Sequence, residues 1–140
     1  MIDERILNFL NTQRLGVLSN VSTEGYPQVS VIHFSHVIDP LHFYISTENT
    51  TRKVKNIEVS EKASLVIGFS ESEWITVQMD GKLEIVKDDL EEAWKIHYAK
   101  NPNSAKYKDL PETVFLKFTP TYLKFTDYNT DPLTLLEIKL

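Results

Sequence analysis

Residues Ser46–Lys53 read STENTTRK and join a strand-like run at 41–45 to a helix-like run that begins near Thr51. Four hydroxyl side chains stand here beside two adjacent cations, Arg52 and Lys53. The first turn of a helix carries unpaired N–H groups and partial positive charge, so two cations are unfavourable there. A bound anion removes that cost, because N–H groups, hydroxyls and cations all favour a phosphate. The segment therefore predicts a phosphate cradle.

The same segment also has a purely structural interpretation. Thr50 can be an ordinary N-cap, with Arg52 and Lys53 solvated beside Glu48 and Glu58. The segment alone favours neither interpretation, so the choice depends on the rest of the chain.

The composition is that of an ordinary globular domain. The chain has 140 residues, 41% hydrophobic and 25% charged, which is enough for one domain with a sizeable core. A net charge of −5 argues against nucleic acid as a partner, and the lack of cysteine excludes disulfides and thiolate chemistry. Neither a signal peptide nor a membrane-spanning run is recognisable, so we expect a single domain over residues 1–140, cytoplasmic and without a membrane partner.

Hydrophobic periodicity and turn residues divide the chain into short elements. Helices are expected over residues 2–11 and 51–59, and from a cap at Asp88 or Asp89 to about Lys100. Strands are expected over residues 15–21, 29–34, 41–46, 63–69, 74–86, 113–118 and 122–126. Thr119-Pro120 separates the last two strands, Asp80-Gly81 indicates a bulge, and the pattern after Asp127 is too weak to assign. Closure of six or seven antiparallel strands into a barrel would remove exposed sheet edges.

The order of these elements resembles the pyridoxamine 5′-phosphate oxidase-like family of FMN-binding split barrels. The likeness covers about residues 2–127 and rests on five pieces in the right order. These pieces are LGVLS at 15–19, EGYPQVS at 24–30, FYIST at 43–47, RKVKNI at 52–57 and WITVQMDG at 74–81. The resemblance implies a mainly β fold with flanking helices, a six- to seven-stranded antiparallel split β-barrel that binds FMN.

The resemblance also assigns residues to the ring of the flavin. Val29, Ser30 and Val31 would lie along the isoalloxazine and present backbone polar groups to its pyrimidine edge. Gln78 falls where relatives have a strand residue that reaches the flavin from the partner subunit. The implied assembly is a homodimer with two cofactor sites at its interface.

The resemblance places the phosphate end of the flavin at the segment 46–53. The resemblance implies that Ser46 and Thr47 flank the ribityl-phosphate, and that Arg52 and Lys53 bind the phosphate. It therefore agrees with the phosphate cradle predicted from the residues alone.

The chain departs from the vitamin B6 oxidases at its C-terminus. Residues 131–134 offer no Trp or Arg to hold a substrate phosphate, so the resemblance supports FMN binding better than oxidation of B6 phosphates. We expect FMN-dependent redox chemistry on a small molecule, with no side chain assigned as catalytic. The alternatives are a non-catalytic flavin- or haem-binding or sensing module, a relative that uses deazaflavin F420, and a cofactor-free interaction module.

Three histidines raise the question of a metal site. The spacing of His33 and His36 sends them to opposite faces of a strand, and no carboxylate has ligand-like spacing to them or to His42. Strand histidines with ordinary hydrogen bonds are the better interpretation, so no metal ligands are expected. Some split-barrel relatives bind haem through a histidine, which keeps haem among the alternatives.

Overall fold

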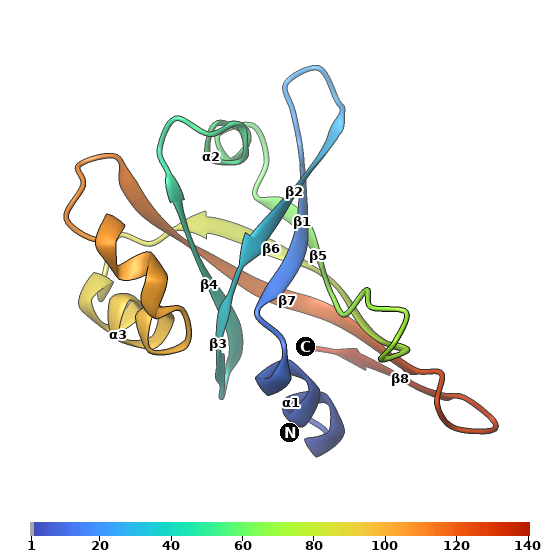
Figure 1. Cartoon of the computed structure of the whole chain (residues 1–140). Coiled ribbons are helices and arrows are strands. Elements are labelled where there is room, and N and C mark those ends of the chain that lie inside the picture. The colour runs from blue at the N-terminus through green and yellow to red at the C-terminus, as the bar shows by residue number, and fades with distance from the viewer. Residues whose placement is uncertain (1) are drawn as a thin grey trace.

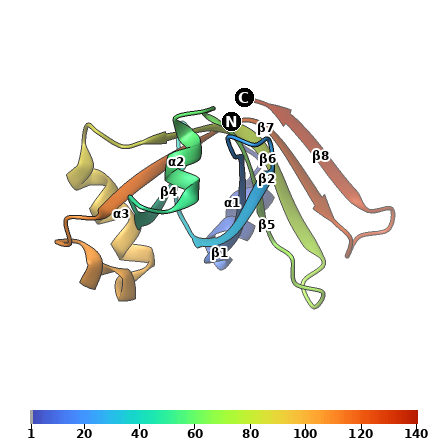
Figure 2. The ribbon, with the colours of Figure 1, turned by 90° about the horizontal axis from the view of Figure 1, so that it is seen from above.

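Eight β-strands in this computed structural model, which describes residues 2–140, form one antiparallel sheet that curls on itself (Figure 1). The strands are β1 (Leu15–Val21), β2 (Pro27–His33), β3 (Ser35–Ile38), β4 (Leu41–Glu48), β5 (Lys62–Ile67), β6 (Ile75–Ile85), β7 (Thr113–Asp127) and β8 (Thr134–Lys139). The helices are α1 (Glu4–Thr12), α2 (Arg52–Ile57), α3 (Leu90–Lys100) and the 3₁₀ helix η1 (Pro102–Tyr107). Seen from above, α3 lies on one side of the curled sheet, and the β7–β8 hairpin projects on the other (Figure 2). The predicted mainly β split barrel is confirmed.

The sheet closes because one extended segment changes neighbours at Phe34. Before this residue β2 pairs with β1, and after it β3 pairs with β4, at the far end of the order β2-β1-β5-β6-β7-β4-β3. The Phe34 N–H donates to the Arg14 carbonyl, and the Phe34 carbonyl accepts from the Asn101 side chain, each at 3.1 Å. The backbone of Phe34 is thus satisfied outside both paired runs, and its ring is fully buried. Sequence analysis did not predict β3, which begins after this bend.

A row of apolar side chains crosses the inner face of the sheet. Leu18, Leu65, Met79, Leu123 and Ile138 face one another on β1, β5, β6, β7 and β8. The first four are almost fully buried, and Ile138 packs against the same core. Full burial of such a side chain contributes about 1.5–3 kcal/mol, so the period-two alternation of the strands stabilises the barrel.

The predicted strand break at Thr119-Pro120 is wrong, because β7 runs through it without interruption. Near Pro120 the register of β6 shifts between Asp80 and Gly81, which confirms the predicted bulge. Proline has no N–H for the ladder, and a bulge leaves one residue unpaired, so the two irregularities accommodate each other. Glycine is required at position 81, because a Cβ there would overlap the Thr119 carbonyl.

The long strand β7 has two neighbours along one edge. Its first half pairs with β4, and its second half pairs with β8. Strand β8 occupies the tail that sequence analysis left unassigned, and its Leu136 and Ile138 pack against the core. The joining of two predicted strands into β7 and the addition of β3 and β8 change the predicted count of six or seven to eight.

The predicted helices are present; the cap of α3 lies at one of the two predicted residues, and the cap of α2 lies one residue later than Thr50. Thr51 rather than Thr50 stands at the N-cap of α2, and its side chain makes no capping hydrogen bond. Asp89 stands at the N-cap of α3 with a φ of 55°, and it also makes no capping hydrogen bond. Within residues 2–140, every helix is too short or too polar to span a membrane.

Candidate functional site

A cavity of about 490 Å³ lies where β2 and β4 separate. Within residues 2–140, β2 pairs only with β1, and β4 pairs with β3 only along its first half, so both strands present free backbone edges to the opening. Val31 and His33 line the cavity from β2, and Ser46 and Thr47 line it from β4. A cavity of this size can hold a small molecule or a cofactor.

The β2 side of this opening carries exposed apolar side chains. Val29 and Val31 are 64% and 65% exposed, and they lie opposite Ser19 and Val17 of β1. Valines on the same face of a regular strand normally pack against other apolar side chains. A cluster of such side chains that is exposed indicates an interaction surface. The exposed side chains of Val29 and Val31 therefore favour contact of this face of β2 with a ligand or with a second subunit.

Hydroxyl groups gather at the other end of the cavity, where β4 leads into α2. The Thr51 hydroxyl donates to the Glu48 carbonyl at 2.9 Å and lies 3.4 Å from the Thr47 hydroxyl. The contact between the two threonines is long, so the Thr47 hydroxyl can turn to a ligand. Ser46 is half-buried beside it. This end of the cavity can therefore donate hydrogen bonds to an oxyanion.

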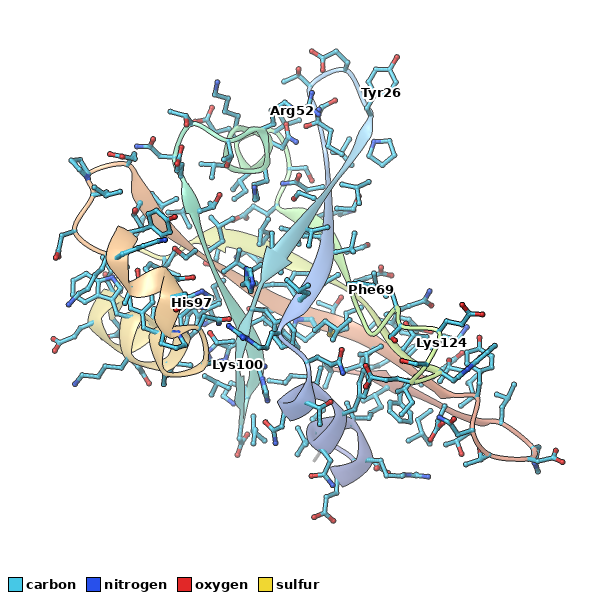
Figure 3. The ribbon with its side chains drawn as sticks, in the orientation of Figure 1. Tyr26, Arg52, Phe69, His97, Lys100 and Lys124 are labelled. Carbon is cyan, nitrogen blue, oxygen red and sulfur yellow. The ribbon has the colours of Figure 1, made fainter. Side chains whose placement is uncertain are left out.

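Arg52 is held in place by side-chain amides. With its amide oxygen turned to Arg52, Gln28 accepts from three guanidinium nitrogens at 3.0–3.1 Å. The Gln28 amide nitrogen then lies 2.6 Å from the Asn56 side-chain amide, which in turn contacts Asn20 at 3.2 Å. These contacts fix Arg52 beside the β1–β2 hairpin, whose tip carries Tyr26 (Figure 3). An arginine held by neutral amides keeps its charge available for an anion.

Lys53 lies between two adjoining cavities. It lines the cavity of about 490 Å³ and also a cleft of about 350 Å³ that includes Val29, Ser30 and Arg52. Burial lowers the pKa of the Lys53 ammonium. Among residues 2–140, neither Arg52 nor Lys53 has a carboxylate within ion-pair distance. Seven of the eight predicted site residues thus line one or other of two adjoining cavities, and the polar end offers two cations that no described carboxylate neutralises.

The sequence matches the family model described as pyridoxamine 5′-phosphate oxidase over residues 2–127. The chain belongs to the pyridoxamine 5′-phosphate oxidase family. Members of this family commonly bind flavin and are typically dimeric. Among curated proteins, the comparison finds no match.

Solved structures similar to this pyridoxamine 5′-phosphate oxidase family member include a heme binding protein and proteins of the general stress protein 26 type. The heme binding protein from Mycobacterium smegmatis has 16% identity and a TM-score of 0.79, over 94% of this chain and 55% of that one. General stress protein 26 from Bacillus anthracis has 23% identity and a TM-score of 0.72, over 98% and 97%. A Clostridium acetobutylicum protein related to general stress protein 26 of B. subtilis has 19% identity and a TM-score of 0.76, over 99% and 97%. At these identities the likeness shows the fold alone, and the chain spans about half of the Mycobacterium protein.

Gln78 is the one predicted site residue that lies outside both cavities. It is exposed on the outer face of β6, between Val66 of β5 and Lys124 of β7. Within a single chain of this family member it cannot contribute to the site, so its predicted role requires a second subunit.

His97 of α3, a buried histidine that sequence analysis did not assign to the site, also lines the cavity. Its Nδ1 lies 3.0 Å from the Ser35 hydroxyl, and its ring packs edge-on against Phe115, with centroids 5.6 Å apart. Burial, with a smaller contribution from His33, lowers the pKa of His97 to about 4. A neutral, buried ring bonded to Ser35 of β3 anchors α3 to the sheet, so we assign His97 a structural role.

The loop between α3 and β7 supplies a wall of the cavity that sequence analysis did not predict. Ser104, Tyr107 and Leu110 line the cavity from this loop. Loop residues have no periodicity that reveals what they contact, so the sequence held no signal for this wall. Within residues 2–140, His, Asp and Glu side chains form no group of three that could hold a metal ion.

Proposed function

We propose that the chain binds FMN in the opening between β2 and β4 and uses it to oxidise or reduce a small molecule. The observation that carries the proposal is the pair of cations Arg52 and Lys53, which have no carboxylate partner among residues 2–140, at the hydroxyl-rich end of the cavity. Such a set of groups favours a phosphate. Membership of a family that commonly binds flavin supports FMN as the molecule that carries it.

The proposed orientation follows from the chemistry of the two ends. Arg52 and Lys53 would hold the phosphate with help from the Ser46 and Thr47 hydroxyls. The flavin ring would lie along β2, where the free backbone groups of residues 29–31 can donate to and accept from its polar edge. A bound flavin supplies the electron chemistry, and the protein residues bind it, orient it and exclude water. No side chain is proposed as acid, base or nucleophile.

A second subunit is proposed to complete the site. Register places Val31, Val17, Val66 and Gln78 in one row across β2, β1, β5 and β6, on the outer face of the sheet. An exposed or half-buried apolar row of this length is typical of surfaces that become buried in homodimers. In the proposed homodimer, this row lies at the interface and Gln78 reaches the flavin of the partner subunit.

Haem is the second candidate ligand, and two observations favour it. The Mycobacterium smegmatis protein that shares the fold is a heme binding protein, and His33 places an imidazole beside the cavity of this chain. Because His97 is buried and bonded to Ser35 whereas His33 is exposed, His33 would be the residue that binds the haem iron. The cations could bind haem propionates as well as a phosphate, so the two ligands must be compared directly.

Titration of the purified chain with FMN, riboflavin and haem tests the proposal. We expect FMN to bind more tightly than riboflavin, which lacks the phosphate. Arg52→Ala is expected to weaken FMN binding by about 10- to 150-fold, the equivalent of one charge-assisted contact of about 1.5–3 kcal/mol. Riboflavin binding should change little.

Lys55→Ala is the matched control for this experiment. Lys55 is an exposed cation on the same helix and lines neither cavity, so its removal should leave FMN binding unchanged. Equal losses for FMN and riboflavin in Arg52→Ala would contradict the phosphate assignment. A Soret band with haem, together with no flavin binding, would favour the second candidate instead.

A further inference from the structure

A separate cavity of about 390 Å³ lies between the end of α1, β3 and α3. Its polar lining includes Asn11, His36 and Lys100, and its apolar lining includes Ile38 and Ile96. Figure 3 shows Lys100 and His97 extending from α3 toward the sheet, but the two side chains line different cavities. The flavin site proposed above does not use this second cavity.

Lys100 brings a positive charge to this cavity without a carboxylate to balance it. Its Nζ donates to the Leu10 carbonyl at 3.2 Å and lies 3.9 Å from the centroid of the Phe34 ring. Among residues 2–140, no Asp or Glu forms an ion pair with it. Burial, and then the charge of Arg14, lower the pKa of Lys100 to about 8. A bound anion would favour the charged ammonium and so oppose the lowering of the Lys100 pKa by burial and by Arg14.

His36 adds a second polar group to the same cavity. Its Nδ1 is buried without a hydrogen-bond partner, while the ring packs near Phe34 and Phe43. Burial, and then the charge of Lys100, lower the pKa of His36 to about 4, so the ring is neutral at pH 7. In the tautomer with the proton on Nε2, the buried Nδ1 is a lone pair and the Nε2–H is a donor. The cavity therefore has an imidazole donor as well as an ammonium.

We infer that this cavity is a binding site for a small monocarboxylate with an apolar body. One ammonium matches one negative charge, and Lys100 and His36 can each donate to one carboxylate oxygen. Ile38 and Ile96 provide the apolar surface for the rest of the ligand. The chain as a whole has a net charge of −5, so anion binding here depends on the Lys100 ammonium in the cavity and not on a generally basic surface.

Calorimetric titration with butyrate tests this inference, with butyramide as the neutral analogue of the same shape. We expect saturable butyrate binding and at least about tenfold weaker binding of butyramide, the size of one charge-assisted contact. Lys100→Gln should weaken butyrate to the level of butyramide, and His36→Phe should weaken it by a smaller factor. Lys95→Gln is the matched control, because Lys95 is exposed on the same helix and pairs with Glu91 at 3.7 Å.

A measurement on the wild-type chain keeps the test independent of how the variants fold. Titration of the Lys100 side chain by NMR should show its pKa rising by about one unit or more when butyrate is bound, as for an opposite charge within contact distance. FMN binding should be unaffected by butyrate, which separates this inference from the proposed function. Equal binding of butyrate and butyramide, an equal loss in Lys95→Gln, or a pKa of Lys100 that butyrate leaves unchanged would overturn the inference.

Discussion

Acidification is expected to destabilise the fold through His97. Its pKa is lowered from 6.5 to about 4 in the folded state, whereas the unfolded chain keeps a value near 6.5. Between these pH values the unfolded state binds more protons than the folded state. The contribution of His97 to the free energy of unfolding is therefore complete above about pH 6.5 and falls as the pH falls toward 4. The whole shift corresponds to about 3 kcal/mol, and about 2 kcal/mol of this is lost between pH 7 and pH 5. The lowered pKa of His36 acts in the same direction.

Urea unfolding of the wild type and of His97→Gln at pH 7, 6 and 5 measures this contribution. The variant lacks the titrating ring. The difference between its free energy of unfolding and that of the wild type should therefore shrink by about 2 kcal/mol from pH 7 to pH 5. Phe115→Leu is the control, because it removes a ring that packs against His97, with centroids 5.6 Å apart, but no titrating group. Its curve should run parallel to that of the wild type. If the His97→Gln curve is also parallel, burial of a neutral His97 does not explain the acid sensitivity.

Three further predictions concern the bulge, the cradle and the assembly. Gly81→Ala should destabilise the fold by about 1–3 kcal/mol or more, because the added Cβ would overlap the Thr119 carbonyl. Gly25→Ala should cost only about 1 kcal/mol, because Gly25 has open space around it and a φ of 88°. Equal losses of unfolding free energy for the two variants in denaturant would refute the packing argument. The affinity for FMN should fall as the pH rises through the lowered pKa of Lys53, because the phosphate favours the charged ammonium, and Lys53→Met should abolish this trend in fluorescence titrations. The FMN-loaded chain should sediment as a dimer, and Val31→Lys should yield monomers without FMN; a stable monomer that retains FMN would contradict the shared site.

Local sequence patterns correctly indicated several elements that build the site. Leu15–Val21 is a strand with the predicted bounds, and the bulge occurs at the predicted Asp80-Gly81. The adjacent cations Arg52 and Lys53 lie in the first turn of a helix, as the segment at 46–53 predicted. These features depend on residues close together in the chain, whose alternation, turn chemistry and charge are visible without knowledge of the fold.

The sequence could not show which distant segments would come together. Pro120 predicted a strand end, but the register shift opposite Asp80-Gly81 leaves the neighbouring Thr121 of β7 without a partner on β6, and β7 continues through both residues. The change of partner at Phe34 depends on a hydrogen bond that its N–H donates to the Arg14 carbonyl and one that its carbonyl accepts from the Asn101 side chain, and both residues are remote in sequence.

The candidate site divides in the same way between local and tertiary determinants. Its cations and hydroxyls belong to one local segment and were predicted, whereas His97 and Tyr107 reach the cavity only because α3 packs against β3 and β4 with η1 beside it. By itself, the sequence determined the strand faces, the turns and the phosphate-favouring group, because these follow from neighbouring residues. The tertiary structure alone decided the opening between β2 and β4, because its walls are set by strand pairing and helix packing over long separations.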